Sequence, residues 1–230
     1  MVASNSGNEC RLGVLAFGDS ITNGGGELQW GVALQSWAQW VARGLGLPFT
    51  NHAVDGADVA HVVHRQIPAF ERATANPGAR YDVGCLYIGA NDVRSPDWDA
   101  ERFARDYSAT VAFLTERCDR TVALTAPLDL GIPKAPWKVA ELNAVVERAG
   151  TLVVDLSDFR ARNRVMADRV HPSAFGQIAI AERALRVLER DGLPTRVQPS
   201  SLISYETTRW RRLRGDATYV YRYLKRRLGG

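Results

Sequence analysis

The sequence predicts an α/β protein in which helices cover both faces of a doubly wound parallel sheet. Short apolar runs alternate with longer segments of helical periodicity along most of the 230 residues, as in parallel sheets with crossover helices. The strand segments are almost continuously apolar, as in YDVGCLYI at 81–88, which is typical of strands buried on both faces. Polar, glycine-containing clusters follow three of these segments, where such sheets place their ligand sites.

The spacing of apolar residues predicts the elements in order. Short runs rich in apolar residues predict strands at 11–17, 48–54, 81–88, 121–125 and 152–156. Apolar residues that recur every three or four positions predict helices at 30–45, 57–70, 100–117, 136–148 and 172–189. Pro68 interrupts the second helix, and Pro172 begins the last one, where its missing N–H costs nothing. Right-handed crossovers then place helices on both faces of the sheet.

The length and composition favour one large domain with an extension. A chain of 230 residues, 46% hydrophobic, can build a full core. We expect a mobile N-terminus at 1–10, a domain at 11–195 and a C-terminal extension at 196–230. Three cysteines give no disulfide framework. Because we find neither a secretory leader nor a run of roughly 20 apolar residues, we expect a cytoplasmic protein.

The charge is unevenly distributed along the chain. Residues 196–230 contain nine lysines and arginines and two acids, a net charge of +7, so the rest of the chain carries −3 of the total +4. A slightly acidic body gives no basic face for nucleic acid, so we expect no nucleic-acid partner.

An apolar stripe runs through the basic extension. Apolar residues recur there at helical spacing: Trp210, Leu213, Ala217, Val220, Leu224 and Leu228. This predicts a basic amphipathic helix, which Gly215-Asp216 would divide in two. Segment 205–228 then either packs on the body or on a second subunit, or rests on anionic lipid as a peripheral membrane contact.

Candidate functional residues follow the first predicted strand. The loop reads Gly18-Asp19-Ser20-Ile21-Thr22. A serine there lies at the mouth of the sheet and at the start of a helix, where backbone amides stabilise negative charge. The alternative is a plain turn, since Gly, Asp and Ser are turn residues.

A possible partner for this serine lies near the end of the domain, in Asp168-Arg169-Val170-His171. A nucleophilic serine needs a base, and the base needs an acid that orients it. Asp168 and His171 are close enough to meet across one tight turn. The alternative is a loop aspartate beside a surface histidine.

Two further loops carry candidate oxyanion donors. Asn91, in Gly89-Ala90-Asn91-Asp92, has a side-chain amide that can donate to a developing oxyanion. Gly56 follows the second strand, and a glycine lets a backbone N–H approach a reacting centre. Turns or a helix cap explain both loops equally well. His61 and His64 share a helix face, but no further ligand has motif spacing, so we expect no metal.

Taken together, these motifs resemble those of the SGNH (GDSL-type) hydrolase family. The matching pieces, in the family's order, are Phe17-Gly18-Asp19-Ser20, Gly56, Gly89-Ala90-Asn91-Asp92 and Asp168-Arg169-Val170-His171, and they cover roughly residues 11–190. Ile21 stands where the family's name-giving leucine is usual. The resemblance implies a three-layer α/β/α sandwich, flavodoxin-like, with five parallel strands and no large lid.

The resemblance also implies an activity and its residues. Ser20 is expected to be the nucleophile, His171 the general base and Asp168 its orienting partner. The Ser20 N–H, the Gly56 N–H and the Asn91 side chain are expected to form the oxyanion hole. The reaction would be hydrolysis of an acyl ester through an acyl-enzyme, with no metal or organic cofactor.

Several alternatives stay open at this point. The same triad serves an acyltransferase, and the loop after the first strand also suits a flavodoxin-like binding protein that cradles a flavin phosphate. A non-catalytic scaffold that works through its extension is a further alternative. As small-molecule partner we expect a short-chain acyl ester, an acetylated sugar or a thioester.

Overall fold

Five parallel strands form the centre of the molecule, in the order β2-β1-β3-β4-β5. The computed structural model describes residues 11–26, 32, 34–74, 76, 78–161, 163–204 and 207–228. The strands are β1 (Val14–Gly18), β2 (Phe49–Asn51), β3 (Tyr81–Tyr87), β4 (Cys118–Leu124) and β5 (Leu152–Val154). All four strand pairings are parallel, so the carboxyl ends of the strands meet at one edge of the sheet. The predicted mobile N-terminus at 1–10 lies outside the described residues.

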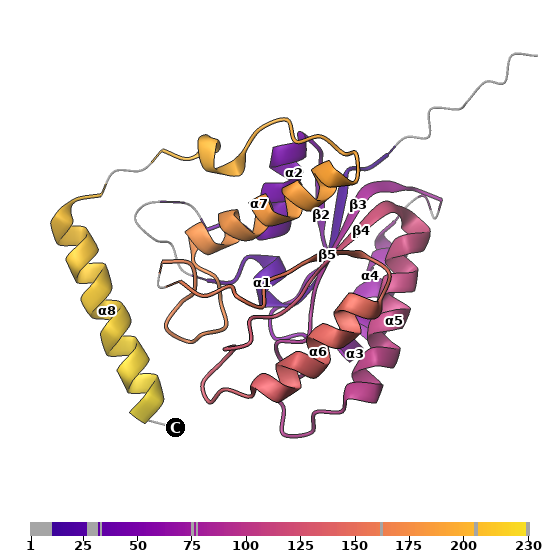
Figure 1. Cartoon of the computed structure of the whole chain (residues 1–230). Coiled ribbons are helices and arrows are strands. Elements are labelled where there is room, and N and C mark those ends of the chain that lie inside the picture. Colours follow the sequence, from indigo (N-terminus) through magenta and orange to yellow (C-terminus); the bar gives the residue numbers. More distant parts are fainter. Residues whose placement is uncertain are drawn as a thin grey trace, which may run out of the picture.

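Helices cover the sheet on both faces (Figure 1). One layer contains α2 (Trp37–Leu45) and α7 (Ala174–Arg190), which pack against each other. The other contains α3 (Val59–His61), α4 (Ile67–Ala73), α5 (Ala100–Arg117) and α6 (Pro136–Arg148). This is the predicted α/β/α sandwich. Its winding reverses between β1 and β3, so the loops that follow these two strands diverge and leave room for a site.

Three predicted helix starts were wrong, and a capping side chain explains each difference. The helix predicted from residue 30 begins at Trp37, because Ser36 caps it by accepting a hydrogen bond from Gln39 N. Residues 27–31 and 33 lie outside the described residues. The last helix begins at Ala174 rather than Pro172, with Ser173 as its cap. The helix predicted from 57 begins at Val59, with Asp58 as its cap.

Pro68 interrupts the helical segment after β2, as predicted, and it does so through a widened turn. A π-helical stretch, Val62–Gln66, separates α3 from α4, and Ile67 N donates to Val62 O, five residues back. Pro68 has no N–H to continue the regular ladder. The widened turn brings the Gln66 side chain inward, where it is almost fully buried.

The core is continuous from one helical layer to the other. Every residue of β1 is buried, and Trp37 at the start of α2 has no exposed surface. Cys85 and Cys118 are both buried free thiols. The buried polar side chain of Gln177 in α7 joins three elements: its amide oxygen accepts from Trp37 N at 2.8 Å, and Nε2 donates to Ile21 O at 3.0 Å.

The first part of the C-terminal extension continues the packing of the body. Arg196 N and Val197 N donate to Gly44 O, and a 3-10 turn at Pro199–Leu202 contacts α2 and α7. The extension then forms α8 (Arg209–Leu228). This helix runs unbroken through Gly215-Asp216, so the division into two helices was wrong. Among the described residues, no helix is long and apolar enough to cross a membrane.

Replacing Gln177 by leucine is expected to lower the free energy of unfolding by about 2–5 kcal/mol, because Trp37 N–H and Ile21 C=O would stay buried without partners. Chemical denaturation measures the change. The matched control is Glu189→Gln on the exposed side of the same helix, where we expect a change within about 0.5 kcal/mol. Equal effects of the two substitutions would contradict the role assigned to Gln177.

Candidate active site

The turn after β1 places Ser20 at the carboxyl edge of the sheet. Gly18 has φ of 144°, and a Cβ there would lie 2.2 Å from Tyr87 O, so only glycine fits. The Gln66 side chain holds both backbone groups of Gly18, accepting from its N–H at 3.1 Å and donating to its C=O at 2.8 Å. Asp19 then caps the short helix α1 (Ser20–Asn23). Ser20 is therefore the first residue of a helix, as the sequence predicted.

Ser20, His171 and Asp168 form a continuous chain of hydrogen bonds. The distance from Ser20 Oγ to His171 Nε2 is 2.9 Å, and that from His171 Nδ1 to Asp168 Oδ2 is 2.8 Å. The three side chains come from segments about 150 residues apart in sequence. The predicted meeting of Asp168 and His171 across a tight turn is confirmed by this geometry.

The turn that carries Asp168 and His171 is held by its own backbone. The second carboxylate oxygen of Asp168 accepts from Val170 N and His171 N, each at 3.0 Å. His171 O accepts from Met166 N at 2.9 Å. Arg169 adopts φ of 61°, a conformation that bends the chain sharply between the two functional residues. Both side chains of the pair are thus fixed before any ligand arrives.

Interactions within the pair favour an ionised Asp168 and make His171 more basic. Burial opposes the charge on Asp168, but hydrogen bonds from the His171 ring and from the Val170 and His171 N–H groups outweigh it, so its pKa lies below the ordinary value. The hydrogen bond to Asp168 raises the pKa of His171 above its ordinary value, against the opposing effect of burial. A histidine of this kind takes up a proton readily.

Gly56 and Asn91 lie on neighbouring loops that line one cavity. Asn91 Nδ2 donates to Ala57 O at 2.8 Å, which uses one of its two amide hydrogens. Gly56 has φ of 77°, and a Cβ there would meet no atom within 4 Å, so the loop is open at this point. The cavity, of about 290 Å³, is lined by Gly56, Asn91 and eleven other residues.

A network of loop contacts connects this cavity with Ser20. Val54 N donates to Gly18 O at 3.1 Å, which attaches the loop before Gly56 to the turn before Ser20. Asp92 accepts from Val59 N through both oxygens, at 3.2 and 3.3 Å. All sequence-predicted site residues therefore lie on loops at the same edge of the sheet.

Two carboxyl groups at this edge, the buried Asp19 and the half-buried Asp92, were not singled out from the sequence. Asp19 has no exposed surface; Oδ1 accepts from Ile21 N, whereas Oδ2 has no hydrogen-bond partner among the residues that the structure describes. Burial raises the pKa of Asp19 to about 7, and the Asp19 charge raises the pKa of His171. Burial likewise raises the pKa of Asp92 to about 6. Sequence reasoning missed them because depth of burial decides their behaviour.

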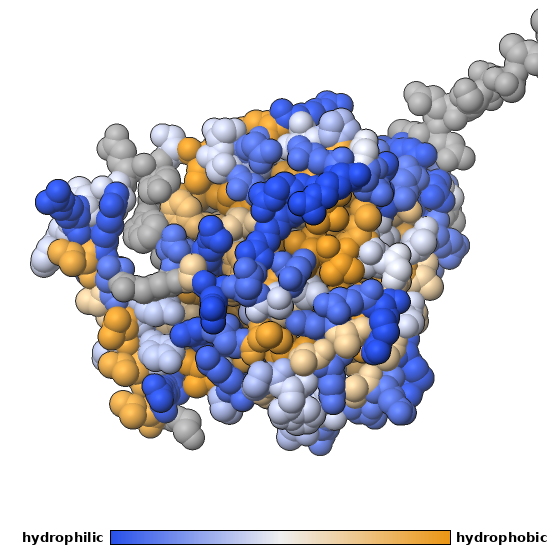
Figure 2. Space-filling model, viewed as in Figure 1, coloured by the Kyte–Doolittle hydropathy of each residue, from blue (hydrophilic) through white to orange (hydrophobic). Residues whose placement is uncertain are grey.

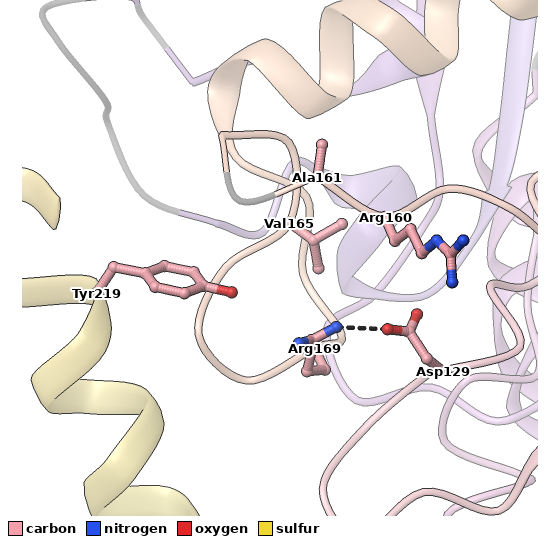
Figure 3. A pocket seen from close by; sticks show the side chains of 6 residues that line it. All are labelled: Asp129, Arg160, Ala161, Val165, Arg169 and Tyr219. Atoms are coloured by element: carbon pink, nitrogen blue, oxygen red, sulfur yellow. Dashed lines mark hydrogen bonds and ion pairs between the residues drawn. The ribbon is translucent and has the colours of Figure 1, made fainter.

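The C-terminal helix reaches the turn that carries Asp168. Arg226 Nη1 lies 3.6 Å from Asp168 Oδ2, the oxygen that also receives the His171 hydrogen bond. The guanidinium of Arg169 lies 5.5 Å from the ring centroid of Tyr223. Figure 3 shows the cavity between this turn and α8, with Tyr219 on one side and the ion pair of Arg169 and Asp129 on the other. Packing of this segment on the body was one of the alternatives that the sequence left open, but nothing in the sequence indicated Asp168 as its partner.

Two of the other three histidines contact side chains outside this triad. His52 stacks on Phe17, with ring centroids 5.5 Å apart, and His61 Nδ1 lies 3.4 Å from Gln66 Nε2. In the part of the chain that the structure describes, no group of three histidine, cysteine or acidic side chains is arranged to hold a metal ion.

The fold and the serine–histidine–aspartate chain define an α/β protein of the hydrolase kind, and comparison with known proteins identifies its family. A model of the GDSL-like lipase/acylhydrolase family matches residues 16–178. The chain belongs to this family, the SGNH hydrolases, and is a hydrolase that acts on ester bonds. This finding excludes the flavodoxin-like binding protein and the non-catalytic scaffold that the sequence alone left open.

Solved structures show the same fold at low sequence identity. A catalytic mutant of Axe2, an acetylxylan esterase from Geobacillus stearothermophilus, is 20% identical with a TM-score of 0.59, covering 78% of this chain and 96% of that one. LAE5, an α/β hydrolase from the metagenome of Lake Arreo in Spain, is 21% identical with a TM-score of 0.57, covering 76% and 94%. Among curated proteins, none matches the sequence.

Asp19→Asn is expected to stabilise the protein at alkaline pH and to leave it unchanged in acid. The folded-state pKa of about 7 exceeds the ordinary value of 3.8, so the parent loses stability as pH rises through this interval, because the buried group ionises. Asparagine keeps the acceptor for Ile21 N and carries no charge. We expect a gain in Tm of at least about 3 °C at pH 8 that vanishes near pH 4.

Thermal melts from pH 4 to pH 9 measure this difference. The control is Asp97→Asn, an exposed aspartate, which should shift Tm little at any pH. A Tm difference for Asp19→Asn that does not change with pH would contradict the raised pKa of Asp19.

Proposed function

We propose that this chain is a serine esterase that hydrolyses short-chain acyl esters through a covalent acyl-enzyme. The observation that carries the proposal is the hydrogen-bonded chain from Ser20 Oγ through His171 to Asp168. It joins a nucleophile, a base and an acid that orients the base, in the geometry that acyl transfer by serine requires. Family membership supports ester hydrolysis in general, and the roles of the residues are our proposal.

In the first half of the reaction, Ser20 Oγ attacks the carbonyl carbon of the ester while its proton passes to His171 Nε2. Asp168 holds Nδ1 of the ring, so Nε2 is the free, basic nitrogen, and the negative carboxylate stabilises the imidazolium that forms. The tetrahedral intermediate then collapses. The bond to the alcohol oxygen breaks, His171 gives its proton to that oxygen, and the acyl group stays on Ser20.

In the second half, water replaces the alcohol. His171 removes a proton from the water as its oxygen attacks the acyl carbon, and the proton then returns to Ser20 Oγ as the carboxylic acid leaves. The raised pKa of His171 suits both directions of proton transfer near neutral pH.

The oxyanion of each intermediate is stabilised by the Ser20 N–H, the Gly56 N–H and the Asn91 amide. Asn91 is well suited because its hydrogen bond to Ala57 O fixes the amide plane and leaves one N–H for the ligand. Donors held in place beforehand need no reorganisation as charge develops. Asp92 supports the arrangement by holding Val59 N two residues beyond Ala57.

The lining of the cavity beside Gly56 and Asn91 favours a small, uncharged or cationic substrate. Five aspartates line it, against one cation, Arg102; they are Asp58, Asp92, Asp97, Asp99 and Asp106. Such a wall repels anionic groups, and the apolar part of the lining is confined to Val59, Ala60, Trp98 and Phe103. It suits short acyl groups and hydroxyl-rich alcohols, since carboxylates accept hydrogen bonds from hydroxyls. Acetylated sugars are therefore among the substrates that we propose.

The cytoplasmic location remains a prediction from the sequence.

Ser20→Ala is expected to abolish activity and covalent labelling together, because no nucleophile remains. A fluorophosphonate probe should label the parent chain once, with mass spectrometry placing the label on Ser20. Labelling at another serine, or ester hydrolysis by Ser20→Ala at more than about a thousandth of the parent rate, would contradict the assignment.

Asn91→Ala is expected to lower kcat about 10²–10³-fold with little change in KM, because the lost donor serves the oxyanion rather than the bound ester. Steady-state kinetics with p-nitrophenyl acetate measure both constants. Since Asn91 also holds Ala57 O, the melting temperature must be measured alongside. A fall in kcat/KM that comes entirely from KM would argue against the oxyanion role.

The substrate preference is expected to fall with acyl length. In a series of p-nitrophenyl esters from acetate to palmitate, we expect kcat/KM to drop at least about tenfold beyond butyrate, because the carboxylate-lined cavity excludes long chains. Acetylated sugars and acyl-thioesters extend the screen. Adding alcohols and following how acyl products divide between acid and new ester separates hydrolysis from acyl transfer. A preference for palmitate would overturn the proposed substrate class.

A further inference from the structure

The C-terminal helix exposes a stripe of large apolar side chains. In α8, Trp210, Leu213, Val220, Tyr221, Leu224 and Leu228 are between 47% and 83% exposed. No side chain of this helix is buried. Figure 2 shows apolar residues along the outer edge of α8, at the left of the view. Single exposed apolar residues are ordinary on a protein surface, but a continuous stripe marks an interaction site.

The stripe points away from the body of the protein. Three residues of α8 have described contacts with the body: Tyr219 lines the cavity beside Arg169, Tyr223 lies under Arg169, and Arg226 pairs with Asp168. These three lie on one side of the helix. At 3.6 residues per turn, the centre of the apolar stripe is roughly 150° further round. The contacts with the body therefore fix which side of α8 is presented outward.

Basic residues border the stripe on both sides. The helix contains eight lysines and arginines and one acid, Asp216, a net charge of +7. By helical geometry, Arg209 and Arg227 lie along one border of the stripe, and Arg214 and Lys225 along the other. An apolar stripe between two rows of basic residues is complementary to a surface that has an apolar layer beneath anionic groups.

We propose that α8 docks the protein onto the surface of an anionic lipid bilayer, with the helix lying in the plane of the headgroups. The apolar stripe would enter the boundary between headgroups and acyl chains, and the bordering arginines and lysines would contact lipid phosphates. Trp210 and Tyr221 are side chains typical of that boundary. The docking is independent of the proposed esterase activity, because it rests on the outer side of α8 alone.

The charge pattern disfavours the other occupants of this surface. Two copies of the chain packed stripe to stripe would bring the four basic residues that border each stripe together along one seam, with no acid between them except Asp216 of each helix. Nucleic acid would satisfy the cations but leave Trp210 and the leucines in water. An anionic bilayer satisfies both features at once.

Flotation of the full chain with vesicles tests the proposal. We expect binding to vesicles of phosphatidylcholine with about one-third phosphatidylglycerol, at least about tenfold weaker binding to phosphatidylcholine alone, and progressive loss as salt rises. Brominated lipids should quench tryptophan fluorescence of the parent more than that of Trp210→Phe. Equal binding to both vesicle types, or no binding to either, would overturn the proposal.

Two variants separate the stripe from the charge. Leu213→Glu/Leu224→Glu should reduce binding at least about tenfold because charges replace inserted side chains, and Arg214→Gln/Lys225→Gln should weaken the preference for anionic vesicles. The matched control is Ser108→Glu/Ala112→Glu, the same charge change on the exposed side of α5, across the molecule in Figure 1. It should bind as the parent does.

Near-UV circular dichroism and thermal melts check that each variant is folded. Light scattering and an RNA-binding assay address the competing occupants. A dimer of the parent that Leu213→Glu/Leu224→Glu dissociates, with no vesicle binding, would overturn the proposal in favour of a subunit contact. Vesicle binding that survives Leu213→Glu/Leu224→Glu undiminished would also overturn it.

Discussion

The site depends first on how the chain turns after β1. Gly18 takes a conformation open to glycine alone, and the buried Gln66 side chain holds both of its backbone groups. Only with this turn fixed does Ser20 begin a helix and face His171 at 2.9 Å. Gln66 ends the widened turn that precedes Pro68, and this turn brings its side chain inward. A side chain of this turn thus helps to position the serine of another loop.

Other side-chain amides hold backbone groups in the same way along the carboxyl edge of the sheet. Gln177 holds the first residue of α2 and the backbone of α1, and Asn143 holds both backbone groups of Ala126 after β4 at 2.7 and 2.9 Å. Each amide side chain comes from a helix and satisfies a loop whose peptide groups are buried. The loops that form the site are therefore part of the packed scaffold, and their positions are set before a substrate arrives.

The sequence predicted the parts of this molecule that depend on local pattern. Alternating periodicities predicted five strands and the sandwich, and α5 and α6 begin and end as expected, because their apolar stripes are long and regular. Spacing predicted that Asp168 and His171 would meet. The roles of Gln66 and Asp19, and the contact of Arg226 with Asp168, depend on tertiary burial and on packing between distant segments. No periodicity records these features, and the starts of three helices were missed because single side-chain caps decide them.

Uncharged side-chain amides hold the backbone at Gly18, Trp37 and Ala126. Their hydrogen bonds do not titrate and are little affected by salt, whereas Asp19 and Asp92, beside them, change charge near neutral pH. The hydrogen bonds that hold the loops at the carboxyl edge of the sheet, and the charges at that edge, are therefore supplied by different side chains. A change of pH near neutrality therefore alters the charge near Ser20 without breaking the amide hydrogen bonds themselves. The charge at the site can therefore change with pH while the side chains that position its loops stay neutral.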